Sequence, residues 1–386
     1  MPRRPRRIDL ALQGGGALGA FTWGVLDRLL EDERIDFGAV SGASAGAMNA
    51  VVLADGLARG GRRGARDALR SFWMRVSNAS GRGPLSSTLA PLLPWALPAL
   101  SAQAWAAAAP WNVLFEGFGR AYAPAQFNPL GVNPLRDILA SEVDFARLRA
   151  YGGVRVSVCA TQVRTGRLRE FAHEELSVDA VMASACLPLL FRTVEIDGEA
   201  YWDGGYLANP SLLPLVAHSA SHDLVLVQIN PSRRDAVPTQ AQPIADRIDE
   251  IIFNGSLERE LRTLALIRRL LAESPPLPAG LSHTPLFERI AALRLHRIEA
   301  DEPLAQPGAA QQFDAGWVGL SRLHRLGRQA AEGWLQTCFA HVGRRGTLPL
   351  ADCLQGLDLG DARPAAATSD DARGQRRRAV RRRPSS

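Results

Sequence analysis

The sequence predicts an α/β fold with three layers, in which helices flank a mostly parallel central sheet. Near the N-terminus a strand–turn–helix unit occurs twice in succession, which is typical of parallel strands joined by helices. The second of these strands, at 37–40, carries no charge, as expected where helices cover both faces of a sheet. Apolar runs at 154–160 and 224–229 are further candidate strands. Together these observations favour one sheet that extends over much of the chain.

The two N-terminal units have the following order. The first begins with the strand 8–12, which ends at a run of three glycines. The helix 17–31 follows, because its apolar residues recur at helical spacing. The second unit leads from the strand 37–40 into a helix at 48–58. In a parallel sheet the ends of the two strands lie beside each other, so the glycine run and the second turn should share one edge.

Later elements have clear local signals. A hairpin is predicted over 193–202, with Asp197-Gly198 at its turn. Helices are expected at 243–271 and 321–339. Another helix should begin at Asn133-Pro134, because asparagine can cap a first turn and proline fits the first helical position.

The two ends of the chain are basic and the body is not. Residues 1–7 form a basic N-terminal arm with four arginines, and seven more lie at 373–386, within the Arg-rich, low-complexity tail 363–386. Together these arginines carry more positive charge than the formal net charge of +6, so the rest of the chain has a net negative charge. Such ends are typical of solvated arms that contact an anionic membrane surface. Disordered ends without a partner are an equal alternative. No nucleic acid partner is expected, and the oligomeric state stays open.

An apolar cap or insertion is predicted at about 83–127. Its first part, 83–115, contains no charged residue and is long enough to span a bilayer, but prolines interrupt it. We expect it to rest on a lipid surface with its tryptophans at the interface. An irregular, buried wall of the core is the alternative.

The composition excludes several classes of enzyme. The chain contains no lysine, which excludes P-loop proteins, protein kinases, pyridoxal-phosphate enzymes and Ser-Lys hydrolases, because each needs a lysine in its site. The four cysteines lie far apart and lack metal-ligand spacing, so we expect free thiols, no metal and no cofactor. The N-terminus begins like a signal peptide, but Asp9 and the glycine run interrupt its apolar region. A cytoplasmic location, with or without peripheral membrane contact, is therefore predicted.

One serine stands among glycines and alanines in the stretch Gly42-Ala43-Ser44-Ala45-Gly46. This stretch matches G-x-S-x-G between a candidate strand and a candidate helix, which is typical of a nucleophile at a sharp turn. Small neighbours expose Ser44, and the free N–H groups at the start of the helix favour negative charge there. Close packing of a helix on a sheet needs the same small residues, so other motifs must support the assignment.

The run Gly14-Gly15-Gly16 offers backbone N–H groups to an anion with no side chain in the way. It is therefore a candidate oxyanion hole for acyl transfer. The same residues begin a G-x-G-x-x-G pattern at 14–19, which is a dinucleotide-binding fingerprint. That alternative needs an acid at the end of the second strand, whereas Asp36 precedes this strand.

An aspartate is the best candidate for the base. Asp203-Gly204-Gly205 follows the second strand of the predicted hairpin, where two glycines let the chain bend away from a free carboxylate. A simple turn is the alternative for this stretch. None of the seven histidines stands in a recognisable motif, which disfavours an α/β-hydrolase that uses a catalytic histidine.

The segments GGGALG, GASAG and DGG, in this order, resemble the motifs of the patatin-like phospholipases. The resemblance extends over roughly residues 8–340 and implies a patatin-like catalytic domain, which we assign to 8–345. It implies a Ser–Asp dyad, with Ser44 as the nucleophile and Asp203 as its base. The substrate would be a lipid ester, hydrolysed through an acyl-enzyme without metal or cofactor. An esterase or a storage-polyester depolymerase with the same dyad is the alternative.

The resemblance also assigns the remaining motif residues. The motif glycines around the dyad are Gly42, Gly46, Gly204 and Gly205. The implied oxyanion hole consists of Gly14, Gly15, Gly16 and Ala17. One position departs from the family, because Leu18 stands where its members often carry arginine or lysine. This departure removes a cation near the site and leaves the backbone donors in place.

Overall fold

The computed structural model describes most of the chain, namely residues 4–80, 133–188, 190–234, 237–274, 284–300, 304 and 315–354. The chain forms two compact units, Met1–Cys353 and Leu354–Ser386. Except for Leu354, every described residue belongs to the first unit. The apolar insertion predicted at 83–127 and the tail predicted at 363–386 lie outside the described residues.

Within the described residues, eight strands form one sheet in the order β5-β6-β3-β2-β1-β7-β8, and β4 pairs with β3 outside this path. The pairs β3–β2, β2–β1, β1–β7 and β7–β8 are parallel. The strands β4, β5 and β6 join through antiparallel pairs. The predicted, mostly parallel sheet is therefore confirmed. The strands are β1 (Arg6–Leu12), β2 (Ile35–Gly42), β3 (Arg155–Gln162), β4 (Arg167–Phe171), β5 (Val194–Ile196), β6 (Glu199–Asp203), β7 (Asp223–Val227) and β8 (Arg294–Ile298).

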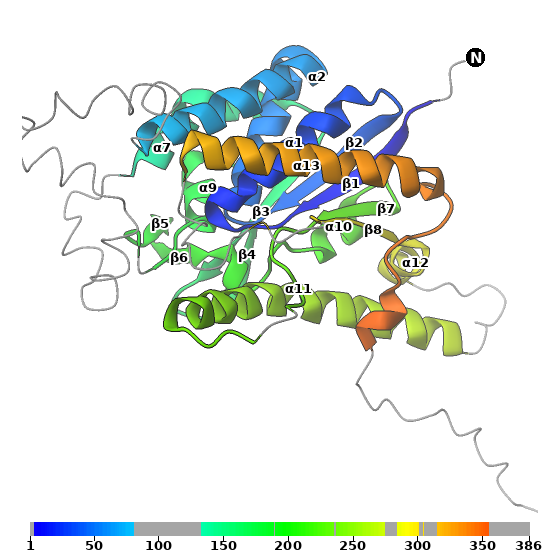
Figure 1. Cartoon of the computed structure of the whole chain (residues 1–386). Helices are drawn as coiled ribbons and strands as arrows, with labels where there is room; N and C mark the ends of the chain where they lie inside the picture. Colours follow the sequence, from blue (N-terminus) through cyan, green and yellow to red (C-terminus); the bar gives the residue numbers. More distant parts are fainter. Residues whose placement is uncertain are drawn as a thin grey trace, which may run out of the picture. The chain divides into compact units, whose positions relative to one another are not determined.

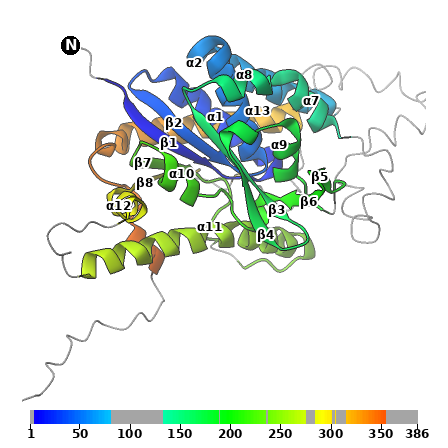
Figure 2. The same cartoon turned by 180° about the vertical axis from the view of Figure 1, so that it is seen from behind.

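Helices cover both faces of this sheet and complete the predicted three layers (Figures 1 and 2). One layer contains α1 (Gly19–Glu31), α2 (Ala45–Ala79), α7 (Pro134–Glu142), α8 (Phe145–Ala150), α9 (Val178–Ser184) and α13 (Trp317–Thr337). The other layer contains α10 (Leu213–His218), α11 (Ala241–Glu273) and α12 (Pro285–Ala292). Short 3-10 helices are η1 (Gly16–Leu18), η3 (His173–Glu175), η4 (Gly204–Tyr206), η6 (Phe339–His341) and η7 (Leu350–Leu354).

The carboxyl ends of three central strands meet at one edge of the sheet. Leu12, the last residue of β1, pairs with Gly42 of β2 and with Val227 of β7. The glycine run after β1, the turn after β2 and the segment after β7 therefore leave the sheet side by side. This register brings together motifs that are far apart in the sequence.

The first strand begins earlier than expected. Arg6 and Arg7 pair with Ile35 and Asp36 of β2, so the last two residues of the predicted 1–7 arm join the sheet. The guanidinium of Arg6 also donates to the carbonyls of Phe339 and Val342, at 2.7 and 2.8 Å. These pairings extend the strand beyond the apolar run that indicated it.

The helix after Ser44 is longer than the predicted 48–58 and has two arms. The arms meet at Gly60-Gly61, where Gly61 has a φ of 60° that favours glycine. They pack so closely that a Cβ atom on Gly56 would lie 2.5 Å from the Cα atom of Ala65. The first arm corresponds to the predicted helix, and the second has no counterpart in the predicted elements.

Two local predictions are confirmed. The hairpin forms from β5 and β6, and both turn residues, Asp197 and Gly198, have positive φ angles of 51° and 78°. The Asn133 side chain caps α7 by accepting the N–H of Leu135 at 3.2 Å, with Pro134 at the first helical position.

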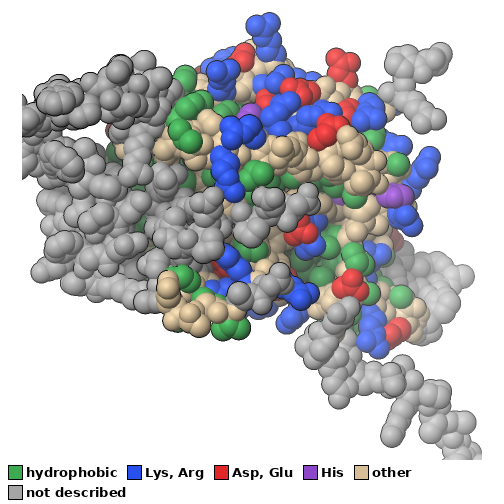
Figure 3. Space-filling model, in the orientation of Figure 1, with side chains coloured by type: hydrophobic (Ala, Val, Ile, Leu, Met, Phe, Trp, Pro, Cys, Tyr) green, Lys and Arg blue, Asp and Glu red, His purple; other side chains and the backbone are tan. Residues whose placement is uncertain are grey.

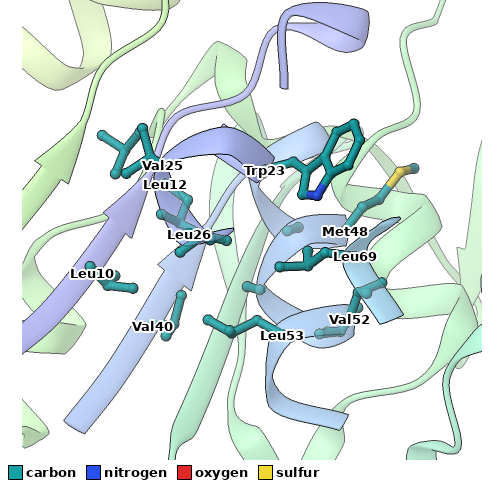
Figure 4. Packing of buried hydrophobic residues seen from close by; sticks show 14 of the residues in the cluster. Leu10, Leu12, Trp23, Val25, Leu26, Val40, Met48, Val52, Leu53 and Leu69 are labelled. Carbon is teal, nitrogen blue, oxygen red and sulfur yellow. The ribbon is translucent and has the colours of Figure 1, made fainter. Parts of the chain in front are cut away.

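The core lies between the sheet and the layer of α1, α2 and α13. Figure 4 shows Leu10 and Leu12 of β1 and Val40 of β2 in one cluster with Leu26 of α1 and Leu53 of α2. All five side chains are fully buried. Each contributes on the order of 1.5–3 kcal/mol to folding, so the strands that carry the motifs are firmly anchored.

Charged side chains of both signs mix over the face where α1, α2 and α13 lie (Figure 3). Arg66 of α2 contacts Asp27 and Glu31 of α1 at 2.6 and 2.7 Å, and Arg328 of α13 contacts Glu31 at 2.8 Å. These ion pairs link the three helices on their solvent side. Among the described residues, no helix combines the length and apolar content needed to cross a membrane.

Candidate active site

Ser44 occupies a strained turn between β2 and α2. Its φ and ψ are 52° and −121°, a conformation that costs on the order of 1–3 kcal/mol for a residue with a side chain. The turn is too tight for side chains at the motif glycines. A Cβ atom on Gly42 would lie 2.5 Å from the carbonyl carbon of Gly46, and one on Gly46 would lie 2.1 Å from the oxygen of Leu12. The small residues therefore place a single half-buried hydroxyl at the tip of the turn.

Two backbone contacts hold this turn. The N–H of Ser44 donates to the Oγ of Ser184, the last residue of α9, at 3.0 Å. The N–H of Gly46 donates to the carbonyl of Ala43 at 2.8 Å. The N–H of Ala45, at the start of α2, has no acceptor among the described residues. It adds to the positive potential of the helix N-terminus beside Ser44.

Asp203 is the last residue of β6 and is fully buried. Its Oδ1 accepts the N–H of Gly205 at 2.7 Å. Its Oδ2 has no directed hydrogen bond among the described residues. The Ser44 hydroxyl is nevertheless near enough to act on this carboxyl and to lower its pKa. A loose contact of this kind is usual for a catalytic pair before substrate binds.

Burial dominates the electrostatics of Asp203. It raises the pKa of this carboxyl from 3.8 to about 7, against the opposing effect of the hydrogen bond from the Gly205 N–H and of the nearby Ser44 hydroxyl. A carboxyl with such a pKa can exchange a proton near neutral pH. The structure thus brings together the two residues that the sequence predicts as nucleophile and base.

The glycines after Asp203 are required by close packing. A Cβ atom on Gly204 would lie 2.1 Å from the carbonyl oxygen of Cys159, and one on Gly205 would lie 2.5 Å from the ring of Phe253. The Oγ1 of Thr161 donates to the carbonyl of Asp203 at 2.8 Å. These contacts fix the backbone of Asp203 against β3 and α11.

The glycine run lies against the serine. A Cβ atom on Gly14 would lie 2.8 Å from the Cβ of Ser44, and Gly16 has a φ of 58°. The N–H groups of Gly15, Gly16 and Ala17 have no acceptor among the described residues. Gly14 differs from the expectation, because its N–H donates to the Oδ1 of Asn209 at 2.7 Å. Three of the four predicted amides are therefore available to an anion.

The described histidines have other partners or lie elsewhere. His296 contacts Asp223 and Thr347, and His324 contacts Asp27. No hydrogen bond joins any histidine of the described segments to Ser44 or Asp203, and His283 lies outside them. In the same segments, no group of three or more His, Cys, Asp or Glu side chains could hold a metal ion.

The geometry disfavours a dinucleotide site at 14–19. Asp36 is exposed and is the second residue of β2, so it lies at the opposite end of this strand from the glycine run. The end of β2 beside the glycine run carries the Ser44 turn instead. This end of β2 therefore lacks the acidic residue that the fingerprint requires to hold the ribose.

Sequence reasoning missed three residues that hold this site. Ser184, Asn209 and Asn230 contact the backbone of the serine turn or of the glycine run. Asn209 lies in "DGGYLANP", directly after a recognised motif, and this proximity was the available signal. Ser184 lies in "ASACLPLLF", outside the three motifs. Asn230 follows β7 without any such signal.

Comparisons with known proteins indicate the family of this chain. Two similar solved structures are VipD from Legionella pneumophila (15% identity, 86% of this chain and 67% of that chain, TM-score 0.36) and the ExoU–SpcU complex from Pseudomonas aeruginosa (17%, 92% and 73%, 0.30). No curated protein matches significantly. The family model of the patatin-like phospholipases matches residues 10–216, more than half of the chain, including Ser44 and Asp203. The chain therefore belongs to the patatin-like phospholipase family.

Proposed function

We propose that this protein is a serine hydrolase that cleaves carboxylic esters of lipids with a Ser44–Asp203 dyad. The family supports lipid acyl hydrolysis. The observation that carries the dyad is the buried carboxyl of Asp203, whose pKa burial raises to about 7 and which interacts with the hydroxyl of Ser44. A weak nucleophile needs such an adjacent base.

Acylation would proceed as follows. Asp203 accepts the proton of Ser44 while Oγ attacks the ester carbonyl, and the carbonyl oxygen becomes an oxyanion. The N–H groups of Gly15, Gly16 and Ala17 stabilise this oxyanion, and each such donor is typically worth about 3 kcal/mol of the barrier. The protonated Asp203 then gives its proton to the leaving alcohol or lysolipid.

In deacylation, water takes the place of the Ser44 hydroxyl. Asp203, ionised again, accepts a proton from water, and the hydroxide attacks the acyl-enzyme carbonyl in the same oxyanion hole. The tetrahedral intermediate collapses, and the proton returns to the Oγ of Ser44. Each step uses residues of this chain, so the proposal includes neither metal nor cofactor.

We also infer that the protein works at a lipid surface as a peripheral protein. The arginines at 373–386 and the uncharged stretch 83–115 support this inference from the sequence. Each arginine near an anionic surface contributes about 1 kcal/mol to binding. Several together would hold the protein there without a membrane span.

Active-site labelling tests the nucleophile. A fluorophosphonate probe should label the wild-type protein at Ser44, and Ser44→Ala should lose both labelling and ester hydrolysis. Ser41→Ala is the matched control, because Ser41 is a buried serine of β2 three residues away. Its labelling should persist. Hydrolysis by folded Ser44→Ala would contradict the proposal.

A substrate panel separates the lipid hydrolase from the alternatives. Purified protein is incubated with phospholipid vesicles, a neutral lipid emulsion, a storage polyester and a short soluble ester, and the products are resolved by mass. Release of fatty acid and lysolipid supports the proposal. Activity confined to the polyester or to the soluble ester would favour the depolymerase or esterase with the same dyad.

A further inference from the structure

The backbone of Gly14 is held from both sides by two buried asparagines. Asn209, which follows the Asp203 turn, accepts the Gly14 N–H at 2.7 Å through its Oδ1. Asn230, which follows β7, donates from Nδ2 to the Gly14 carbonyl at 3.1 Å. The Nδ2 of Asn209 donates to the same carbonyl at 3.4 Å. Two separate segments thus converge on one residue of the glycine run.

Two further amides surround Asn230. The Oε1 of Gln13 accepts the N–H groups of Ile229 and Asn230, both at 2.8 Å. The Nε2 of Gln13 donates to the Oδ1 of Asn254 at 2.8 Å, and Asn254 donates to the carbonyl of Pro231 at 3.0 Å. The side chains of this amide cluster (Gln13, Asn209, Asn230 and Asn254) are all buried.

Burial makes this arrangement specific. A buried amide without partners costs on the order of 1–3 kcal/mol per lost hydrogen bond, so each side chain of the cluster is kept in the orientation that satisfies it. The segment after β7 and the turn after β6 are therefore tied to the glycine run by directed bonds. The position of Gly14 is set by contacts that are 195 and 216 residues away in the sequence.

Planarity of the peptide bond transmits this constraint to the next residue. The carbonyl of Gly14 and the N–H of Gly15 belong to the same trans peptide unit, so they point in opposite directions. The carbonyl points at Asn209 and Asn230. The Gly15 N–H therefore points away from the amide cluster, and it has no acceptor among the described residues.

We propose that Asn209 and Asn230 are positioning residues that aim the Gly15 N–H at the oxyanion. This inference rests on the proposed hydrolase function and adds two residues to it. Neither side chain touches the reacting atoms. Asn209 also joins the Asp203 turn to the glycine run, so the base and the oxyanion donors keep a fixed separation.

Paired inhibitors test a positioning role. A fatty trifluoromethyl ketone forms an oxyanion adduct with a catalytic serine, whereas the matched methyl ketone binds mainly through its chain. In Asn230→Leu and in Asn209→Leu, the Ki of the trifluoromethyl ketone should rise and kcat should fall by on the order of 10- to 100-fold, which is below the effect of deleting a donor. KM and the Ki of the methyl ketone should change by less than about threefold.

Asn49→Leu is the control for the loss of a buried amide. Asn49 is also fully buried and donates to the carbonyls of Gly19 and Ala45 at 3.1 and 3.0 Å, without contact to Gly14. The Asn49→Leu substitution should lower the melting temperature and leave the ratio of the two Ki values unchanged. Asn209 and Asn230 act through separate hydrogen bonds, so the test needs only one of the two variants to fold.

The outcomes separate the two proposals. If folded Asn230→Leu or Asn209→Leu keeps wild-type kcat, or if both ketones weaken equally, the positioning role is wrong while the hydrolase remains. If the wild-type protein neither hydrolyses esters nor is labelled at Ser44, the proposed function itself fails. A selective loss of trifluoromethyl ketone affinity supports both.

Discussion

Replacing Asp203 by asparagine should stabilise the folded protein at alkaline pH while it removes activity. Burial raises the pKa of Asp203 from 3.8 to about 7. Between these two values the folded chain keeps the proton that the unfolded chain has lost. The free energy of unfolding therefore falls as the pH rises through this window, and the loss is complete above the folded pKa. At 1.36 kcal/mol per pKa unit, the loss amounts to about 4 kcal/mol.

Asparagine has no proton to lose, so Asp203→Asn escapes this cost. Between pH 5 and pH 8, the free energy of unfolding of the wild type should fall by about 3 kcal/mol relative to that of the variant. Denaturant unfolding followed by circular dichroism at the two pH values measures this difference. All other titrating groups occur in both proteins, so their contributions cancel.

Asp9 offers a matched control. It is buried in β1, burial raises its pKa to about 7, and its Oδ1 accepts the N–H of Ala39 at 2.9 Å. Asp9→Asn should show a similar gain in stability at pH 8 and keep its activity, whereas Asp203→Asn should lower kcat by on the order of 10²- to 10⁴-fold. An active Asp203→Asn variant, or one that gains no stability relative to the wild type between pH 5 and pH 8, would contradict the role assigned to Asp203.

Two further predictions concern the pH profile and the lipid surface. Below pH 7, kcat/KM for a soluble ester should fall about tenfold per pH unit, because a protonated Asp203 cannot accept the proton of Ser44; a flat profile from pH 5 to pH 7 would exclude this base. Deletion of 373–386 should weaken binding to anionic vesicles, more at low salt than at high salt, because ions screen the arginines. Vesicle sedimentation at two ionic strengths measures this effect, and unchanged binding would show that the tail makes no lipid contact.

The parallel core of the fold was predictable because its signal is local. The apolar runs of β1, β2 and β7 mark strands that helices cover on both faces. The strand β8 lacks this signal, since Arg294 and His296 interrupt it. Both side chains find their partner in Asp223, which no local pattern could indicate. The strand β4, "RLREF", is similarly polar and forms only because β3 offers it an edge.

The residues of the proposed dyad could be picked out for the same reason. Ser44 and Asp203 stand in short motifs whose glycines are required, because a Cβ atom added to them would lie only 2.1 to 2.6 Å from nearby backbone or ring atoms. The residues that orient them were not predictable, because Asn209 and Asn230 are ordinary asparagines until the fold brings them to Gly14. Sequence reasoning also counted the Gly14 N–H as free, since nothing local shows that Asn209 accepts it.

Both residues of the proposed dyad lower the stability of the chain, and this constrains how the site is built. The backbone of Ser44 is strained by on the order of 1–3 kcal/mol, and ionised Asp203 costs about 4 kcal/mol at alkaline pH. Neither residue would keep its conformation if the residues around it were loosely packed. The hydrogen bond from the Ser44 N–H to Ser184 keeps Ser44 in its strained conformation. The hydrogen bond from the Gly205 N–H to Asp203 keeps the Asp203 carboxyl in its buried position. Asp203→Asn at alkaline pH and Ser44→Gly, which relieves the backbone strain, should therefore stabilise the fold and inactivate the protein, whereas substitutions at their supports should weaken both properties together.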